Sequence, residues 1–373
     1  MPLHVEMPAT PRILAATTLS FDISLFELFQ PLVSGGTVVL ADDAARRNPQ
    51  ALAELIRQHD VDIVQATPTS LRMLVDNDWV PHAELTIISG GEPLPADLAE
   101  RLLSQNAQLY NIYGPTEATV YCSGTKIREP TQITIGKPLA NMALFVVDSA
   151  GELCPEGVYG EIYIGGTGLA KGYLGRPNLN ASAFSELELR GIGRQRLYRS
   201  GDLGRLLANG EIELAGRIDR QVKVRGVRIE LGEIEQQLLA ISGIRQATVI
   251  VREDRQDDKR ITAYVSGEAV PDSQTIISKL KNVLTPAMTP AAVVTMANIP
   301  ITSSGKVDNS ALPRPTEATT AGTNPPREGL ERVLCDLFGD VLGVACESRD
   351  ANFFELGGHS LLLVSLANRS TRN

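Results

Sequence analysis

The sequence predicts a multidomain protein that combines an α/β part with α+β parts, and three observations support this fold class. The chain has 373 residues, which is more than one ordinary domain needs to bury a core. In the first half, short apolar runs alternate with helical patterns. The middle of the chain changes to hairpin-like strands, and residues 313–329 form a segment rich in Pro, Thr and Gly. Such a segment is typical of a linker, so a further unit is expected after it.

Strand and helix patterns alternate in the first half. VDIVQATP (61–68) and ELTIISGG (84–91) are short apolar runs that end in turn residues, which is typical of buried strands. PADLAERLLSQ (95–105) follows with its apolar positions at helical spacing, and the run AQLYNIYG (107–114) comes after it. Strand, helix and strand in this order predict a mostly parallel sheet in an α/β layer.

The rest of the chain is expected to form antiparallel and smaller units. GVYGEIYIGG (157–166) and GRLLANGEIELAGR (204–217) are strand-like, and Asn209-Gly210 predicts a tight hairpin turn because this pair readily adopts positive φ angles. A smaller α+β unit is expected next. Its predicted elements are an alternating strand (221–230), an amphipathic helix (231–242) and two strands (246–254 and 260–267), and another amphipathic helix (330–343) opens a third unit.

Composition and charge exclude several classes of function. The net charge of −9 argues against a general nucleic-acid-binding protein, whose surface would be basic. No stretch approaches the roughly 20 apolar residues of a membrane span, and the first residues lack the pattern of a secretory signal. The four cysteines are scattered and the four histidines do not cluster, so neither a disulfide framework nor a His-rich zinc site is expected. We therefore expect a cytoplasmic protein that binds neither nucleic acid nor a membrane.

A candidate nucleotide site begins at NIYGPTEAT (111–119), where a strand ends and a loop opens. Tyr113 offers a ring for a base, Thr116 a hydroxyl for phosphate, and Glu117 a carboxylate for Mg²⁺. Gly114 allows close approach of the backbone. On its own, the segment fits a Gly-Pro turn with a solvated glutamate equally well.

Two further segments strengthen the nucleotide interpretation. YRSGDLGR (198–205) contains Asp202, and GRIDRQVKVRG (216–226) contains Arg217 and Lys223. An aspartate accepts hydrogen bonds from two ribose hydroxyls and an arginine reaches sugar or phosphate, so the three loops together indicate a nucleotide site. The alternative for the basic segment is a solvated strand face.

Two glycine-containing segments are not assigned to phosphate binding by their pattern. Lys306 lies in SSGKVDNSAL (303–312), but Val307 follows it where a P-loop has Ser or Thr. The glycines of GGTGLAKGYLGRP (165–177) do not fit a dinucleotide-binding fingerprint. We interpret the latter segment as turn-forming glycine in a β-rich region.

Seven motifs follow one another along the chain. They are FDIS (21–24), NIYGPTE (111–117), GEIYIGGTGLAKGYL (160–174), YRSGDL (198–203), GRIDRQVKVRGVRIELGEIE (216–235), SSGKVD (303–308) and NFFELGGHSLL (352–362). In order and approximate spacing, the first six resemble the adenylation domains of nonribosomal peptide synthetases. The last resembles the phosphopantetheine attachment site of the peptidyl carrier domain that follows in such modules.

This resemblance implies the adenylate-forming fold, with a large lobe, a small α+β lobe and a helical carrier domain. The implied divisions are a partial large lobe (1–219), a C-terminal lobe (220–313), a linker (314–327) and a partial carrier domain (328–373). The implied reaction joins an α-amino acid to ATP, releases pyrophosphate, and passes the aminoacyl group to a carrier thiol. The implied cofactors are ATP, Mg²⁺ and 4′-phosphopantetheine.

The resemblance also assigns nucleotide-binding roles. The residues implied to surround adenine are Gly90, Gly91, Glu92, Asn111, Tyr113 and Gly114. Those implied to hold ribose, phosphate or Mg²⁺ are Asp202, Arg217, Thr116 and Glu117. Tyr113 would stack on the base, Asn111 would hydrogen-bond its amino edge, and Glu117 would hold Mg²⁺.

Three residues have implied roles in catalysis and motion. Lys306 matches the catalytic lysine that bridges the substrate carboxylate and the α-phosphate, where attack concentrates negative charge. Asp219 matches the hinge between the lobes, with a surface turn residue as the alternative. Rotation there would bring the loop that begins at Lys223 to the thioester-forming site.

A further set of residues is implied to bind the amino acid. Asp22 matches the aspartate that pairs with the α-ammonium group, which points to an α-amino acid rather than an aryl or fatty acid. The other implied lining residues are Phe26, Gln65, Ile87, Ser89, Ile112, Val120 and Tyr121. This lining is mainly apolar and none of it is charged. We therefore expect a substrate with a neutral side chain of small or medium size.

Ser360 is implied to carry 4′-phosphopantetheine as a phosphodiester. The expected helix N-terminus there favours a phosphate group, although the commoner role of such a serine is an N-cap. The implied partners are the amino acid substrate, a phosphopantetheinyl transferase, and other synthetase domains such as a condensation domain.

The chain departs from the family pattern at both ends. The phosphate loop rich in Ser, Thr and Gly does not appear among the twenty residues before Phe21, and thirteen residues follow Ser360. We therefore expect both terminal domains to be partial, and no pyrophosphate exchange above background by the isolated chain. The alternatives are a catalytically inactive fragment or partner-dependent chain, and another adenylate-forming enzyme, an acyl- or aryl-CoA ligase. Asp22 and the carrier motif count against the last.

Overall fold

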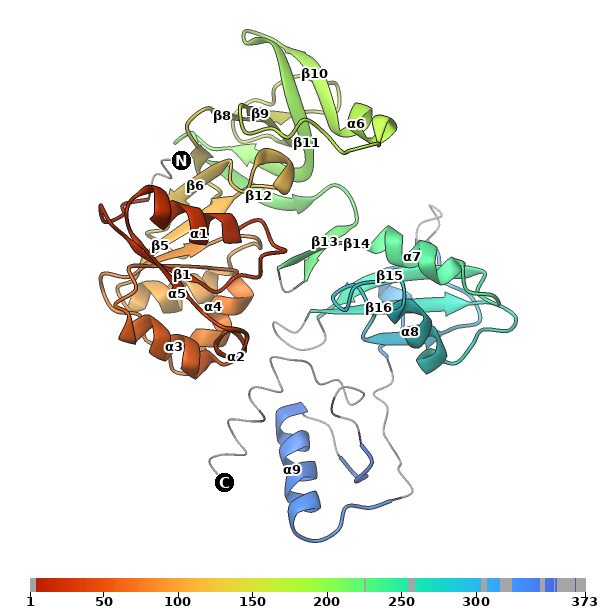
Figure 1. Ribbon diagram of the computed structural model, residues 1–373. Coiled ribbons are helices and arrows are strands. Elements are labelled where there is room, and N and C mark those ends of the chain that lie inside the picture. Colours follow the sequence, from red (N-terminus) through yellow and green to blue (C-terminus); the bar gives the residue numbers. More distant parts are fainter. Residues whose placement is uncertain are drawn as a thin grey trace. The chain divides into compact units, whose positions relative to one another are not determined.

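Figure 1 shows the computed structural model of the chain. The structure describes residues 5–224, 226–253, 259–302, 307–315, 324–342, 346–351, 353 and 366. The chain divides into two compact units, Met1–Gly226 and Val227–Asn373. Lys306 and Ser360, which the sequence marks as the catalytic lysine and the attachment site, lie outside the described residues.

A seven-stranded sheet begins the first unit, with neighbours in the order β2-β1-β3-β4-β5-β6-β7. Its strands are β1 (Arg12–Ala15), β2 (Thr37–Leu40), β3 (Ile63–Ala66), β4 (Thr86–Ser89), β5 (Gln108–Tyr113), β6 (Ser123–Lys126) and β7 (Lys137–Pro138). Neighbours are parallel from β2 to β5, and β6 and β7 add antiparallel strands. The predicted mostly parallel sheet is confirmed.

Helices cover both faces of this sheet. They are α1 (Ser24–Val33), α2 (Asp43–Arg47), α3 (Pro49–Gln58), α4 (Pro68–Val75) and α5 (Ala96–Ser104). The last of these lies within the stretch predicted as a helix from its spacing. Helices α3, α4 and α5 contribute to one apolar core, while α1 contributes to another. Burial on both faces explains why the strands are continuous apolar runs in the sequence.

Successive residues of β4 belong to these two different cores. Ile87 packs in the core that contains Leu71 and Leu98 from α4 and α5. Ile88 packs in the core that contains Phe26 from α1 and Tyr121. The reason is that successive side chains of a strand point to opposite faces.

An antiparallel sheet completes the first unit, in the order β10-β11-β9-β8 with β12 paired to β11. Its elements are β8 (Met142–Val147), β9 (Tyr159–Gly166), α6 (Pro177–Ala183), β10 (Phe184–Leu189), β11 (Gly193–Leu206) and β12 (Ile212–Arg217). The predicted hairpin is present as β11 and β12. Its turn is longer than a tight two-residue turn, because Leu206 pairs with Ile212, and of Asn209 and Gly210 only Gly210 has a positive φ (+79°).

Thr116–Ala118 forms the short 3₁₀ helix η1 between β5 and β6, and Gln221–Val224 forms β13 near the end of the first unit. The run 221–230, predicted as one alternating strand, is interrupted at Gly226, whose φ is +79°. A side chain is unfavourable at such a φ, so glycine suits this break.

The second unit contains a three-stranded sheet in the order β15-β16-β17. Its elements are β14 (Val227–Glu230), α7 (Leu231–Leu239), β15 (Gln246–Arg252), β16 (Arg260–Ser266), α8 (Ser273–Lys281), β17 (Ala292–Thr295), the 3₁₀ helix η2 (Asn309–Ala311) and α9 (Leu330–Leu342). Strands β15 and β16 are antiparallel, and β17 adds in parallel. The predicted small α+β unit and the helix after the linker are therefore both present.

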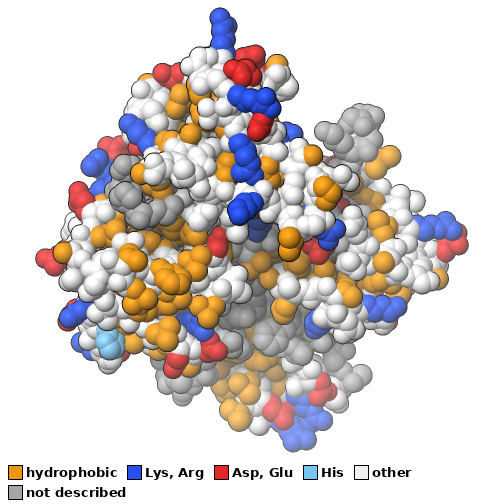
Figure 2. Space-filling model, turned by 45° about the horizontal axis from the view of Figure 1, so that its top comes forward, with side chains coloured by type: hydrophobic (Ala, Val, Ile, Leu, Met, Phe, Trp, Pro, Cys, Tyr) orange, Lys and Arg blue, Asp and Glu red, His pale blue; other side chains and the backbone are white. Residues whose placement is uncertain are grey.

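Hydrophobic side chains gather on one exposed face of the molecule (Figure 2). Helix α1 carries several exposed ones: Phe26 is buried, whereas Phe29 and Leu32 are 57% and 64% exposed. A helix that is apolar around much of its circumference is typical of one buried in a larger core. Among the described residues, no helix combines the length and hydropathy needed to cross a membrane.

Candidate functional site

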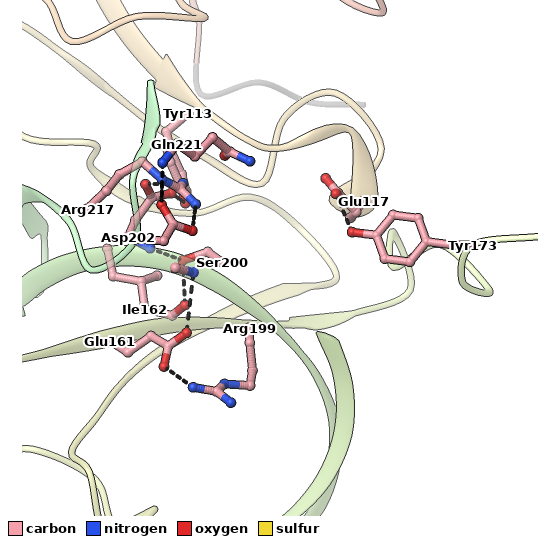
Figure 3. Close-up of polar contacts among 12 residues, drawn as sticks. Tyr113, Glu117, Glu161, Ile162, Tyr173, Arg199, Ser200, Asp202, Arg217 and Gln221 are labelled. Carbon is pink, nitrogen blue, oxygen red and sulfur yellow. Dashed lines mark hydrogen bonds and ion pairs between the residues drawn. The ribbon is translucent and has the colours of Figure 1, made fainter. Parts of the chain in front are cut away.

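Tyr113, Asp202 and Arg217 form a continuous polar chain (Figure 3). The Tyr113 hydroxyl at the end of β5 donates to Asp202 Oδ2 at 2.5 Å, and Arg217 Nη1 donates to Asp202 Oδ1 at 2.7 Å. Burial, and then the Asp202 carboxylate, raise the pKa of Tyr113 well above its usual value, so the hydroxyl remains a donor at neutral pH. The structure thus brings together three residues that the sequence places in separate motifs.

The backbone around Asp202 is held in place by its neighbours on β11 and β9. Ser200 Oγ donates to the Ile162 carbonyl at 2.6 Å and accepts from the Asp202 amide at 3.0 Å. Gly201 has a φ of +73°, and a Cβ there would lie 2.7 Å from Arg217 Nη2. Gly201 is therefore required both by its conformation and by the nearby guanidinium.

Asp219 is the second carboxylate partner of Arg217. Arg217 Nε donates to Asp219 Oδ1 at 2.7 Å, and Nη2 donates to Oδ2 at 2.6 Å. The Gln221 amide also donates to Asp219 Oδ1 at 3.1 Å. This bidentate pair fixes the direction in which Arg217 points. Asp219 therefore positions the predicted ribose-binding arginine, whatever part it has in lobe motion.

The loop after β5 contacts Asp22, which the sequence predicts as a site residue, and Tyr173, which it does not. Thr116 Oγ1 donates to Asp22 Oδ2 at 2.6 Å, which joins the residue predicted to hold phosphate to the one predicted to hold the α-ammonium group. Glu117 is buried, and its Oε1 accepts from the Tyr173 hydroxyl at 2.6 Å (Figure 3). Tyr173 belongs to the glycine-rich segment that the sequence interpretation left without a role.

The predicted amino-acid site contains a buried polar network. Tyr121 donates its hydroxyl to Gln65 Oε1 at 2.5 Å, and Gln65 Nε2 donates to Glu27 Oε1 at 3.0 Å. Thr17 donates to the same carboxylate through its amide, at 2.9 Å, and its hydroxyl, at 2.5 Å. Burial raises the pKa of Glu27 despite these donors. The ring of Phe26 packs edge-on against Tyr121, with centroids 6.4 Å apart.

The structure separates the predicted amino-acid residues between the two faces of β4. Ile112 and Val120 share the core of Phe26 and Tyr121, whereas Ile87 lies in the opposite core. Ser89 lies two positions after Ile87 and therefore on the same face of β4, because side chains alternate along a strand. Its buried hydroxyl has no hydrogen-bond partner. Ile88 and Gly90 thus occupy the face on which Ile87 and Ser89 were expected.

The residues predicted to surround adenine are partly engaged within the fold. Asn111 donates Nδ2 to the Thr134 carbonyl at 2.7 Å, which leaves its Oδ1 as the acceptor for an adenine amino group. Glu92 accepts from the Thr69 amide at 3.1 Å and hydroxyl at 2.7 Å, and also from the Gly226 amide. Glu92 therefore joins Thr69, at the start of α4, to Gly226.

At two glycines of this site, an added side chain would come too close to neighbouring atoms. A Cβ on Gly114 would lie 2.4 Å from the Val120 carbonyl oxygen, and one on Gly90 would lie 3.2 Å from Ile112 Cγ1. Gly91 has a φ of +83°, a backbone conformation that favours glycine.

Lys223, the residue predicted to begin the loop that moves to the thioester-forming site, lies on β13.

Sequence reasoning missed four residues that the structure brings to the site. They are Glu27, Ile88, Tyr173 and Gly201. The alternation of β4 could have separated Ile88 from Ile87. No local signal marks Glu27, and the motif that contains Tyr173 (160–174) does not indicate its partner, because Gln65 and Glu117 are distant from them in the sequence.

Three family models match the chain. The model described as AMP-binding enzyme matches residues 1–174, the AMP-binding enzyme C-terminal domain matches 233–306, and the phosphopantetheine attachment site matches 332–371. These matches follow the same order as the sequence motifs.

Similar curated proteins are large synthetases. A dimodular nonribosomal peptide synthase of Bacillus subtilis (strain 168) is 43% identical over 360 residues, covering 96% of this chain and 15% of the relative. Tyrocidine synthase 3 of Brevibacillus parabrevis is 38% identical over 371 residues, covering 97% of this chain and 6% of the relative. The chain thus spans less than a sixth of either relative.

Similar solved structures are also nonribosomal peptide synthetases. A holo nonribosomal peptide synthetase protein containing adenylation and PCP domains, bound to a vinylsulfonamide inhibitor, is 30% identical with a TM-score of 0.81, over 99% of this chain and 63% of that one. A four-domain holo nonribosomal peptide synthetase bound to AMP and glycine is 40% identical with a TM-score of 0.56, over 98% of this chain and 28% of that one.

The fold and the three matched models place the chain in the class of AMP-binding, adenylate-forming proteins. Within that class, the chain belongs to the nonribosomal peptide synthetases, as an adenylation region followed by a carrier region.

Proposed function

We propose that the chain activates an α-amino acid as aminoacyl-AMP and passes the aminoacyl group to phosphopantetheine on Ser360. The observation that carries this proposal is the 2.6 Å hydrogen bond from Thr116 Oγ1 to Asp22 Oδ2. An α-amino acid bears its ammonium and carboxylate groups on the same carbon. With the ammonium group at Asp22, its carboxylate would therefore lie beside a phosphate held at Thr116. Such proximity is a large part of what catalysis of a two-substrate reaction requires.

The ribose is proposed to bind at Asp202 and Arg217. Asp202 accepts from the Tyr113 hydroxyl and from Arg217, so its carboxylate is already oriented toward hydroxyl and cationic donors. Tyr113 would stack on adenine, and Asn111 would accept from the base amino group. Gly90, Gly91 and Glu92 would form the wall of the same pocket.

Glu117 fits a Mg²⁺ site that also uses nucleotide phosphates. Among the residues that the structure describes, no group of three or more His, Cys, Asp or Glu side chains is placed to hold a metal. Mg²⁺ usually keeps several waters and takes one or two carboxylates together with phosphate oxygens. A single buried carboxylate beside the predicted phosphate site suits that chemistry. When bound, Mg²⁺ supplies neutralisation of charge on the phosphates, and Lys306 is proposed to add its ammonium group.

The amino acid is proposed to have a small neutral side chain. Gln65, Tyr121 and Glu27 already satisfy one another, so a polar substrate side chain would have to compete with these bonds. Phe26 packs on Tyr121, and Ile112 lies close to Gly90. These bulky groups favour side chains of the size of glycine or alanine.

The partners and the motion follow from the same proposal. A phosphopantetheinyl transferase would load Ser360, and a condensation domain would use the aminoacyl thioester. Asp219 would be the hinge, and Lys223 would belong to the loop that moves to the thioester-forming site. We place these events in the cytoplasm.

Binding of aminoacyl-sulfamoyl adenosines, measured by calorimetry, tests the proposal on this chain. These analogues lack the β- and γ-phosphates, so they probe the amino-acid, ribose and adenine sites alone. Glycyl and alanyl analogues should bind more tightly than leucyl or phenylalanyl ones, and aspartyl and lysyl analogues should bind most weakly. Asp22→Asn should weaken the glycyl analogue by about 10-fold or more, because it removes a charged hydrogen bond.

The control compound lacks the α-ammonium group. Asp22→Asn should leave its affinity unchanged, and the exposed Asp78→Asn should affect neither compound. Equal affinity of the unsubstituted chain for both compounds would contradict amino-acid activation. Such a result would favour an acyl- or aryl-CoA ligase instead.

A further inference from the structure

The glycine-rich segment between β9 and α6 is tied to the loop of Glu117 by three hydrogen bonds. Tyr173 donates its hydroxyl to Glu117 Oε1 at 2.6 Å, and the Ala170 amide donates to the Glu117 carbonyl at 2.8 Å. Thr119 Oγ1 donates to the Gly168 carbonyl at 2.5 Å. Both the backbone and the side chain of Glu117 are therefore held by this segment.

Tyr173 is itself fixed by groups that do not involve Glu117. Asn180 Oδ1 accepts from the Tyr173 amide at 2.6 Å, and Asn180 Nδ2 donates to the Tyr173 carbonyl at 2.9 Å. The Tyr173 ring packs edge-on against Phe184, with centroids 5.7 Å apart and planes at 63°. Gly172 is needed beside this clamp, because a Cβ there would lie 2.7 Å from Asn180 Oδ1.

The cation of Arg196 stabilises the same segment. Its Nη2 donates to the Ala170 and Lys171 carbonyls at 2.8 and 3.0 Å, and its guanidinium carbon lies 4.9 Å from the centroid of the Phe184 ring. The hydroxyl of Tyr173 is thus delivered to Glu117 from a braced loop. A braced donor loses little conformational entropy when it forms its bond, so it is suited to orient a partner.

We propose that Tyr173 is a positioning residue, whose hydroxyl orients the Glu117 carboxylate for the Mg²⁺–nucleotide complex. This inference rests on the proposed function, in which Glu117 is the protein's carboxylate for that complex. Carboxylates that ligate a metal are commonly oriented by such outer hydrogen bonds, and loss of one typically costs 10- to 100-fold in metal affinity or activity. A purely structural bond would instead change stability and leave metal affinity as it is.

The test measures Mn²⁺ binding by the full 373-residue chain in the presence of α,β-methylene-ATP, with free Mn²⁺ read by electron paramagnetic resonance. Tyr173→Phe keeps the ring and removes the hydroxyl. We expect it to weaken nucleotide-dependent Mn²⁺ binding about 10-fold, and to leave the affinity for metal-free AMP unchanged. Glu117→Gln should weaken Mn²⁺ binding at least as much, and adding Tyr173→Phe to it should cause no further loss, because the two residues act as one unit.

Two more variants complete the experiment. Tyr159→Phe removes the hydroxyl of a half-exposed tyrosine on β9 and should change neither affinity. Asn180→Ala leaves the Tyr173 hydroxyl present but frees its backbone, so it should weaken Mn²⁺ binding by a smaller factor. This variant also tests the inference if Tyr173→Phe does not fold.

The outcomes separate the inference from the proposed function. Unchanged Mn²⁺ affinity in Tyr173→Phe, or an equal loss of AMP affinity, would overturn the positioning role alone. If the unsubstituted chain binds neither AMP nor nucleotide-dependent Mn²⁺, the proposed function fails and the inference fails with it.

Discussion

The hydroxyl of Tyr121 donates to the side-chain oxygen of Gln65 at 2.5 Å, inside the first unit and 56 positions apart in the sequence. Both residues are almost completely buried. Through Gln65 the bond continues to the buried carboxylate of Glu27. The predicted amino-acid site is therefore shaped by a network that crosses from β3 to α1 and to the loop after β5.

Removing the Tyr121 hydroxyl should destabilise the protein. In Tyr121→Phe, Gln65 Oε1 loses its donor while it remains buried, which should cost about 1–3 kcal/mol of unfolding free energy. Urea unfolding of the two proteins measures the difference. Tyr159→Phe, which removes an exposed hydroxyl, serves as the matched control and should lie within about 0.5 kcal/mol of the unsubstituted chain. Equal stability of both variants would show that the network adds nothing.

Glu27 should make the protein less stable as the pH rises. Its pKa is raised in the folded state above the ordinary value of 4.5, chiefly by burial. The folded state therefore binds the proton more tightly than the unfolded chain, so this contribution to stability is fully present below about pH 4.5 and is lost as the pH rises through the folded pKa. Urea unfolding between about pH 4 and 8 should show a steeper decline for the unsubstituted chain than for Glu27→Gln. Parallel curves for the two proteins would contradict this prediction.

Ser200 should tolerate threonine but not alanine. Its hydroxyl donates to the buried Ile162 carbonyl and accepts from the Asp202 amide. Ser200→Ala leaves both groups without this partner and should cost about 1–3 kcal/mol, with weaker AMP binding because Asp202 loses its support. Ser200→Thr keeps the hydroxyl and should stay within about 1 kcal/mol. Thermal unfolding measures the stability change and AMP titration measures the binding change. Ser182→Ala, at an exposed serine, is the control and should change neither. A threonine variant as impaired as the alanine variant would refute the role of the hydroxyl.

Ser360 should accept a phosphopantetheine group from coenzyme A. Incubation of the chain with a phosphopantetheinyl transferase should add the mass of one such group, and peptide mass spectrometry should locate it on Ser360. Ser360→Ala should remain unmodified, whereas Ser370→Ala, ten positions on, should be modified like the unsubstituted chain. Modification of Ser360→Ala at another serine would contradict the assignment.

Much of the fold could be predicted because it depends on local patterns. The apolar runs of β3 and β4 and the helical spacing of α5 are visible in the sequence, since strand and helix periodicities are short-range properties. The break at Gly226 was not predicted, because alternation continues on both sides of it and only the φ of +79° reveals the interruption. The turn at Asn209 and Gly210 was also predicted too short, because strand register is decided by pairing across β11 and β12.

The sequence by itself determined the class of this protein and most of its proposed nucleotide site. Tyr113, Asp202 and Arg217 stand in motifs whose residue types already indicate adenine and ribose, and the structure joins them. Only the tertiary structure decided which side of β4 faces the proposed amino-acid site, that Glu27 supports Gln65, and that Tyr173 contacts Glu117. The physical reason is that a hydrogen bond depends on where two side chains lie in space, and residues 38 or 56 positions apart are brought within 3 Å of each other only when the sheets and loops have packed.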